Sequence, residues 1–297
     1  MIGPRLFIAT ALTFGLPACS SDSGDDDGGD GPDDGYELLI DHDWSIPPGE
    51  HYYCIRQTLE EDLYIGGFEA IAPMGTHHTL ISAGNPVSPD GVFDCSAGEH
   101  NFTAMIYESS TGTDRFELPD GLAAKVPAGA QINLNLHVIN AGDGDLSGTS
   151  GVRYLPRAEA EVTSLATIVH MGPVTLELPE GETTTVVGQC TLPANVTAFG
   201  VMPHMHALAT HQKVTVKNPS GDVVLFDDDF SFDATKHLFD VEPMVEINQG
   251  TIVEVACTYN NTTGAPVYWG NDSYSAEMCS GAVYLFPAEG VQTICAN

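Results

Sequence analysis

Positively charged residues are scarce in this chain of 297 residues, which has 9 Lys and Arg against 41 Asp and Glu. The formal net charge is -32 at pH 7. Because nucleic-acid binding requires clusters of Lys and Arg that neutralise phosphates, we expect no nucleic-acid partner. The acidity indicates an adaptation for solubility, of the kind that a saline habitat favours.

Helical periodicity is nearly absent. Short alternating runs of apolar and polar residues, separated by Gly, Pro, Asn and Asp, recur throughout the chain. This pattern predicts an all-β fold. We expect two jelly-roll-like antiparallel β-sandwich domains in tandem, an N-terminal one at residues 36–157 and a C-terminal one at residues 158–297.

Two segments give the clearest strands. Residues 131–138 alternate strictly, so their two faces are predicted to hold Ile132, Leu134, Leu136 and Val138 on one side and Gln131, Asn133, Asn135 and His137 on the other. Residues 196–206 are predicted to place Ala198, Gly200, Met202, His204 and His206 on one side and Phe199, Val201 and Met205 on the other. Further strands are expected at residues 183–190, 213–217, 251–259 and 281–286.

The N-terminal apolar run is too short to span a bilayer as a helix. It follows Arg5 and ends in Leu16-Pro17-Ala18-Cys19, which resembles a lipobox. Residues 1–19 therefore predict a lipoprotein signal peptide with lipidation at Cys19, and a plain secretory signal stays open as the alternative. We expect an exported monomer, held by its N-terminal lipid anchor at the bacterial outer membrane and facing the cell surface or the periplasm.

Residues 20–35 hold seven Asp among Gly and Ser. A segment of this composition cannot bury apolar surface, so we expect a disordered acidic tether. An Asp-rich calcium site is the weaker alternative, because EF-hand spacing is lacking.

Without Cys19 the chain has six cysteines, Cys54, Cys95, Cys190, Cys257, Cys279 and Cys295. An even number in an exported chain predicts three disulfides.

The histidines and one methionine point to metal chemistry. On a strand, residues i and i+2 project to the same face, so His204 and His206 can bring two imidazoles to one metal. Met205 then faces the core, and a solvated polar pair is the alternative interpretation of the two histidines. Met278 adds a thioether, a soft donor that suits Cu(I) and not zinc, magnesium or calcium. The sequence thus favours redox chemistry over hydrolysis.

A second group comprises His77, His78 and His137. Adjacent strand residues point to opposite sides, so His77 and His78 can share one ion only through a bulge or different ring nitrogens. Gly75 and Thr76 can bend the chain there. The remaining histidines are expected to be surface or structural residues, namely His42, His51, His100, His170, His211 and His237.

The order of these motifs resembles the copper type II, ascorbate-dependent monooxygenases, whose known members are peptidylglycine α-hydroxylating monooxygenase and dopamine β-monooxygenase. The matching motifs are Tyr53-Cys54, Thr76-His77-His78-Thr79, Asp94-Cys95, Leu136-His137, His204-Met205-His206 and Glu277-Met278-Cys279. The resemblance covers about residues 36–297.

The resemblance implies two separate copper ions, one per domain. His77, His78 and His137 would hold an electron-transfer copper, and His204, His206 and Met278 would hold the catalytic copper that binds oxygen and substrate. It also implies three disulfide pairs, Cys54 with Cys95, Cys190 with Cys295, and Cys257 with Cys279.

The residues that grip the substrate depart from the family pattern. Met202 stands where the peptidylglycine enzyme has an Arg, and Ser280 and Ala282 stand where it has Asn and Tyr. Because those groups hold a terminal carboxylate, a glycine-extended peptide is doubtful as the substrate.

The function expected from the resemblance is hydroxylation of a C-H bond in a small organic substrate. The reaction would use O2 and an external one-electron reductant, ascorbate or a similar molecule. Two alternatives stay open: a copper-binding or copper-delivery lipoprotein without turnover, and a structural β-sandwich adhesin without copper.

Overall fold

The computed structural model describes residues 34–96, 104–109, 115–232, 238–270 and 272–296. The predicted signal peptide, Cys19 and nearly all of the predicted tether lie outside these residues. The all-β fold is confirmed, with antiparallel sheets in sandwich-like arrangements and one short 3-10 turn, η1 (Glu159–Glu161). Within the described part of the chain, no helix is long and apolar enough to cross a membrane.

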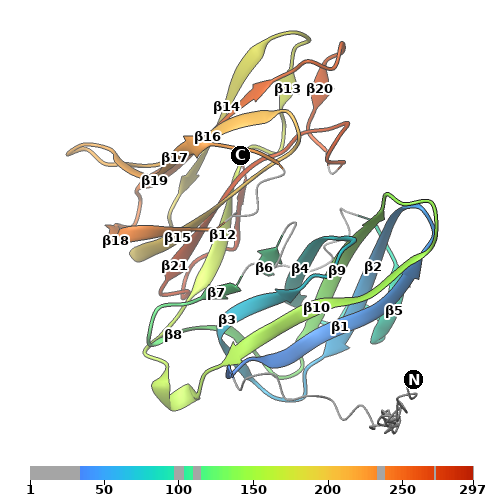
Figure 1. Cartoon of the computed structure of the whole chain (residues 1–297). Helices are drawn as coiled ribbons and strands as arrows, with labels where there is room; N and C mark the ends of the chain where they lie inside the picture. Colours follow the sequence, from blue (N-terminus) through green and yellow to red (C-terminus); the bar gives the residue numbers. More distant parts are fainter. Residues whose placement is uncertain (1–33, 97–103, 110–114, 233–237, 271, 297) are drawn as a thin grey trace, which may run out of the picture. The chain divides into compact units, whose positions relative to one another are not determined.

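The strands up to β11 form two sheets, which we call the first lobe (Figure 1). One sheet has the order β1 (Glu37–Ile46), β10 (Leu146–Pro156), β3 (Leu63–Ile71), β8 (Leu122–Val126) and β11 (Ser164–Leu165), with β7 (Arg115–Glu117) also paired to β3. The other has the order β5 (Gly91–Asp94), β2 (Gly49–Thr58), β9 (Gln131–Asn140), β4 (Thr76–Gly84) and β6 (Ala104–Ser109).

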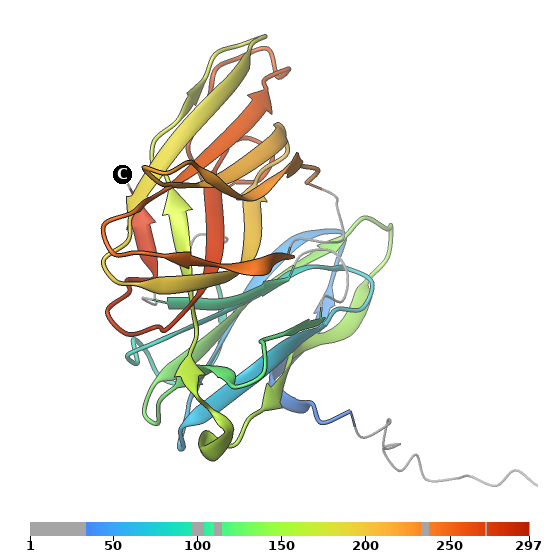
Figure 2. The same ribbon diagram turned by 90° about the vertical axis from the view of Figure 1, so that its left-hand side faces the viewer.

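The strands from β12 onward form the second lobe, which Figure 2 shows from another side. Its largest sheet has the order β18 (Phe239–Ile247), β15 (Val196–Met205), β21 (Cys279–Phe286), β12 (Thr167–Gly172) and β22 (Ile294–Ala296). A second sheet has the order β14 (Thr183–Thr191), β19 (Ile252–Asn260), β16 (Ala209–Lys217) and β17 (Val223–Asp229), and β13 (Glu177–Leu178) pairs with β20 (Val267–Tyr268).

The division into two domains after residue 157 stays a prediction, because residues 35–297 cluster as one compact unit. The chain does not leave the first lobe at that position, since β11 pairs in parallel with β8 at Ser164 and Leu165. The core of the first lobe also takes in five buried side chains of the second lobe, Ile168, Phe199, Met202, Ala282 and Tyr284. The two lobes therefore share buried apolar surface.

Strand β9 is buried along both faces, although its sequence alternates. The apolar face packs in the core of the first lobe. Two side chains of the polar face bond to loop residues: the Gln131 side-chain amide donates to Asp90 Oδ1 at 2.8 Å, and the Asn135 amide donates to the Ser96 carbonyl at 3.1 Å. Because buried polar groups need partners, this face holds His137 in a fixed polar setting.

The prediction for Phe199 was wrong. We expected it on the side of Val201 and Met205, but it clusters with Met202, whereas Ala198 lies in the second core with Val201 and Met205. The reason is a register shift between Ala198 and Gly200, where β15 opposes both β18 and β21. An extra residue in a bulge reverses the side to which the preceding side chains point.

The three disulfides implied by the resemblance are present, Cys54 with Cys95, Cys190 with Cys295, and Cys257 with Cys279. The third joins β19 to the first residue of β21, directly after Met278. It therefore ties the strand that carries the methionine to the opposite sheet of the second lobe.

Candidate metal centres

His77, His78 and His137 come together in the first lobe. Strand β4 has a register shift between Thr76 and His78, so the expected bulge is present at His77, and His78 lies opposite His137 on β9. One ring nitrogen from each histidine lies within 4.8 Å of the others. The ring centroids are 4.7 Å apart for His77 and His137, and 5.1 Å apart for His78 and His137.

The neighbours of this cluster keep its rings in place. Tyr52 stacks on His137 with 4.0 Å between ring centroids, and Asn135 Oδ1 lies 3.2 Å from His78 Nε2. Burial and, to a smaller extent, charge repulsion from His78 and His77 together lower the pKa of His137 to about 2. His137 is thus neutral at physiological pH, which is the form that binds a metal.

In the second lobe, the pairing of β15 with β21 ends directly next to His206 and Met278. His204 lies opposite Ser280 and Met205 lies opposite Cys279, so the same register continued by one residue would put Met278 across from His206. Residues directly opposite each other in an antiparallel pair project to the same face. The His204 and His206 rings are 5.6 Å apart between centroids. Met205 is buried in the core of this lobe, as predicted.

The tautomer of His206 is set by a backbone contact. Its Nδ1 lies 3.0 Å from the Ala276 carbonyl oxygen, a contact that requires Nδ1 to donate. The Nε2 lone pair then remains for a metal. Burial lowers the pKa of His206 to about 4, and the neighbouring His204 also lowers it.

His204 has a carboxylate partner from the first lobe. Its Nδ1 lies 3.2 Å from Oε1 of Glu108, on β6. Burial opposes the charged form of His204, but Glu108 outweighs burial and raises the pKa of the imidazole. Burial likewise opposes ionisation of Glu108, and the nearby His204, His78 and His170 reverse this effect and lower its pKa. The carboxylate and the imidazole thus each favour the charged form of the other.

Glu277 fixes the turn that follows the two histidines. Its carboxylate accepts the backbone N–H of His206 at 2.9 Å and that of Leu208 at 2.7 Å. The Tyr259 hydroxyl donates to the Met278 carbonyl at 2.6 Å. These buried contacts hold the end of β15 against the start of β21, where the methionine lies.

Glu277 predicts a pH dependence of stability. Burial raises its pKa from 4.5 to about 7, although the backbone N–H groups of Leu208, His206 and Met278 lower it. Since the folded pKa exceeds the unfolded one, the contribution to stability is complete below pH 4.5 and is lost as the pH rises through 7. The loss is at most about 3 kcal/mol.

Urea unfolding of the copper-free chain across this pH range measures the effect. The stability of wild type relative to Glu277→Gln should fall as the pH rises, because glutamine does not titrate. A difference between the two chains that stays constant with pH would contradict the assignment to Glu277.

A comparison of the sequence with known protein families finds a match in the second lobe, which holds His204, His206 and Met278. Residues 162–297 match the family model described as copper type II ascorbate-dependent monooxygenase, C-terminal domain. Residues 162–297 are thus similar to the C-terminal domain of these monooxygenases. The resemblance expected from the motif order is confirmed over these residues, and the three histidines of the first lobe lie outside the match to the monooxygenase domain.

Other comparisons add nothing about function. No curated protein matches the chain. Among solved structures, a chain from the structure of infectious bursal disease virus Gx strain is 9% identical to this chain. The match covers 88% of this chain and 76% of that chain, with a TM-score of 0.24. The major capsid protein P2 from bacteriophage PM2 is 6% identical, with 84% and 100% covered and a TM-score of 0.29. Likenesses this weak carry no argument about the monooxygenase domain.

The positions that grip the substrate in the peptidylglycine enzyme lie next to the histidine pair of the second lobe. Met202 is directly opposite Ala282, and His204 is directly opposite Ser280. The two pairs are neighbours on the same face of the sheet, because only Pro203 and Gly281 lie between them. Both Met202 and Ala282 are buried in the core shared by the lobes. The face therefore has apolar side chains where that enzyme has Arg and Tyr, and a hydroxyl where it has Asn.

The donor set fits copper at both centres. Imidazole nitrogens suit copper, and a thioether selects its reduced form. Two groups escaped the sequence analysis. Glu277 stands directly before the methionine in the recognised motif, so its position in the sequence could have indicated that it lies near the metal ligands. Glu108 is 96 residues from His204, and nothing in the sequence indicates their contact.

Proposed function

We propose that the chain is a copper-dependent monooxygenase that hydroxylates a C-H bond of a small organic substrate, with O2 and an ascorbate-like reductant. The observation that carries the proposal is a group of three histidines in the first lobe, whose ligand nitrogens lie within 4.8 Å of one another, in a chain whose C-terminal part matches the model of a copper type II monooxygenase domain. A second set of soft and imidazole donors lies in that domain. Two redox centres suit a reaction that takes up two electrons from outside.

The residues have separate roles in this proposal. His77, His78 and His137 would hold one copper, and His204, His206 and Met278 would hold the other. Copper bound there supplies one-electron chemistry toward O2. The chain itself orients the rings: His206 donates its Nδ1 proton to the Ala276 carbonyl, and Asn135 Oδ1 contacts His78 Nε2.

The substrate proposed is one without a carboxylate. Each Lys and Arg in the described ranges already has a polar or charged partner. The pairs are Arg56 with Asn133, Arg115 with Glu69, Lys125 with Asp62, Arg153 with Glu69, Arg157 with the Leu122 carbonyl, Lys213 with Asp227, and Lys217 with Asp222. The positions beside the histidines are the apolar Met202 and Ala282. Neither arrangement suits a terminal carboxylate.

The decisive experiment is oxygen consumption by the copper-loaded chain with ascorbate and a panel of small apolar, aromatic and amine compounds. We expect hydroxylated product, labelled from 18O2, with at least one of them, and none with carboxylate-terminated peptides. A chain that binds two copper ions and consumes no oxygen with any compound would favour the copper-delivery alternative.

Met278→Ile is expected to weaken Cu(I) binding at the second centre and leave the first centre unchanged. Isoleucine is apolar and similar in size, but it has no sulfur to bind the soft ion. Anaerobic titration against a chromophoric Cu(I) chelator measures both sites. Met244→Ile, a half-exposed methionine on β18 of the same sheet, is the matched control. Equal Cu(I) content in wild type and Met278→Ile would remove the methionine from the centre.

The export and anchoring of the chain remain part of the proposal. A lipid on Cys19 would place the lobes at the bacterial outer membrane, where an oxidising compartment suits the three disulfides. Mass spectrometry of the N-terminal peptide from the native host tests this, with a diacylglyceryl group expected on the cysteine.

A further inference from the structure

The imidazole of His204 is held from outside its own lobe. Glu108 lies on β6 of the first lobe, and its Oε1 is 3.2 Å from Nδ1 of His204 on β15 of the second lobe. The Glu108 side chain is only 15% exposed. A carboxylate that is this buried, aimed at one nitrogen of a ring, restricts both the rotation of the ring and the position of its proton.

This contact selects the nitrogen that faces a metal. When Nδ1–H donates to Glu108, the lone pair of the neutral ring is on Nε2. The neighbouring His206 has the same arrangement, since its Nδ1 donates to the Ala276 carbonyl. Both rings therefore present Nε2 for binding, at the C-terminal end of β15.

Glu108 orients the ring and is not placed as a further ligand. Within the described residues, the only group of three His, Cys, Asp or Glu ligand atoms that lie within 4.8 Å of one another is that of His77, His78 and His137. Glu108, His204 and His206 do not form such a group. The carboxylate is thus an outer partner of the histidine, of the kind that fixes metal-bound imidazoles in proteins.

We infer that Glu108 is a positioning residue of the second centre, which fixes the ring and tautomer of His204 across the contact between the lobes. The inference rests on the proposed function, because it requires a metal at His204. It means that copper affinity in the monooxygenase domain depends on a side chain of the first lobe.

The test uses the full chain and two variants, Glu108→Ala and Glu108→Gln, with Cu(I) as the probe in an anaerobic chelator competition. We expect Glu108→Ala to weaken binding at the His204 centre by about 10- to 100-fold, the usual loss when an outer partner is removed. Glu108→Gln should be intermediate, because its amide oxygen accepts the N–H without the charge. Affinity at the three-histidine centre should stay unchanged in both variants.

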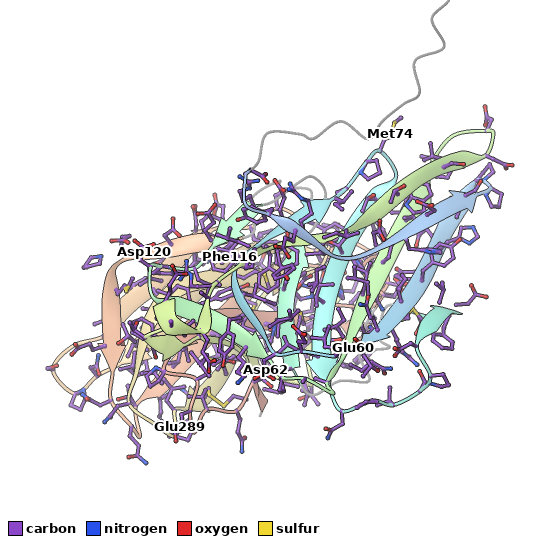
Figure 3. All side chains as sticks on the ribbon, turned by 90° about the horizontal axis from the view of Figure 1, so that it is seen from below. Glu60, Asp62, Met74, Phe116, Asp120 and Glu289 are labelled. Carbon is purple, nitrogen blue, oxygen red and sulfur yellow. A yellow bond between two sulfur atoms is a disulfide. The ribbon has the colours of Figure 1, made fainter. Side chains whose placement is uncertain are left out.

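Two controls separate positioning from folding. Glu60→Gln removes one negative charge at an exposed site after β2, labelled in Figure 3, and should leave both affinities unchanged. Thermal unfolding of each copper-free variant reports whether the lobes remain folded. If Glu108→Ala fails to fold, Glu108→Gln decides the matter, and an affinity within twofold of wild type overturns the inference.

The outcome also separates this inference from the proposed function. A wild-type chain that binds no copper at His204, His206 and Met278 would overturn both. A wild type that binds two copper ions, with Glu108→Ala binding them equally tightly, would overturn the role of Glu108 alone.

Discussion

His206→Ala is expected to bind one copper ion per chain in place of two and to lose turnover almost completely. The ring is buried, and its Nε2 is the donor left free by the bond from Nδ1 to Ala276. Removal of an outer partner of a metal ligand costs about 10- to 100-fold in activity. Because alanine removes a direct ligand, we expect a larger loss of activity, of about 100-fold or more. Copper counting by absorption spectrometry and product formation measure the two effects.

His211→Ala provides the control for His206→Ala. His211 is on β16 of the same lobe, and its Nε2 is paired with Asp227 at 3.1 Å. We expect two copper ions and wild-type turnover in that variant. Two copper ions bound to His206→Ala, with activity retained, would end the assignment of the second centre.

Removing the Cys257–Cys279 disulfide by a double change to alanine is expected to destabilise the chain by about 3 kcal/mol, the size for a closed loop of this order. The two cysteines are 22 residues apart and buried in the second core. Because Cys279 directly follows Met278, the start of β21 also loses its link to β19. We therefore expect a lower Cu(I) affinity at the second centre in addition to the lower stability.

The Cys190–Cys295 disulfide gives the comparison. It closes a longer segment of 105 residues, so its removal should cost more stability, about 4 to 5 kcal/mol. It joins β14 to β22 and touches neither copper-binding segment, so Cu(I) affinity in the folded protein should be unchanged. Urea unfolding and chelator competition on both variants check these results, and equal losses of affinity in the two would contradict a local role for Cys279.

Much of the fold and of the first centre could be predicted from the sequence because the signals were local. Alternation over residues 131–138 gave β9, and the impossibility of two adjacent strand residues facing one ion predicted the bulge at His77. The spacing of His204 and His206 likewise followed from strand geometry alone. The disulfide pairs came from the motif order and are present as expected.

The features that the sequence did not reveal depend on pairing between distant strands. The bulge at Phe199 is followed directly by Gly200, but a single glycine does not fix the position of a bulge, and the faces reverse because β18 and β21 impose their register. The contact of Glu108 with His204 joins residues 96 positions apart. Because the chain has 41 Asp and Glu, the sequence alone does not indicate that Glu108 is the one that contacts His204.

The shared core has a practical consequence for dissecting the protein. Phe116 of the first lobe packs on Tyr284 of the second with 4.8 Å between ring centroids, and Phe199 and Met202 lie in the same cluster. An isolated fragment of residues 162–297 would leave these aromatic and sulfur-containing side chains facing water. Such a fragment should self-associate when expressed alone, so its failure to bind copper would report aggregation and not the chemistry of the centre.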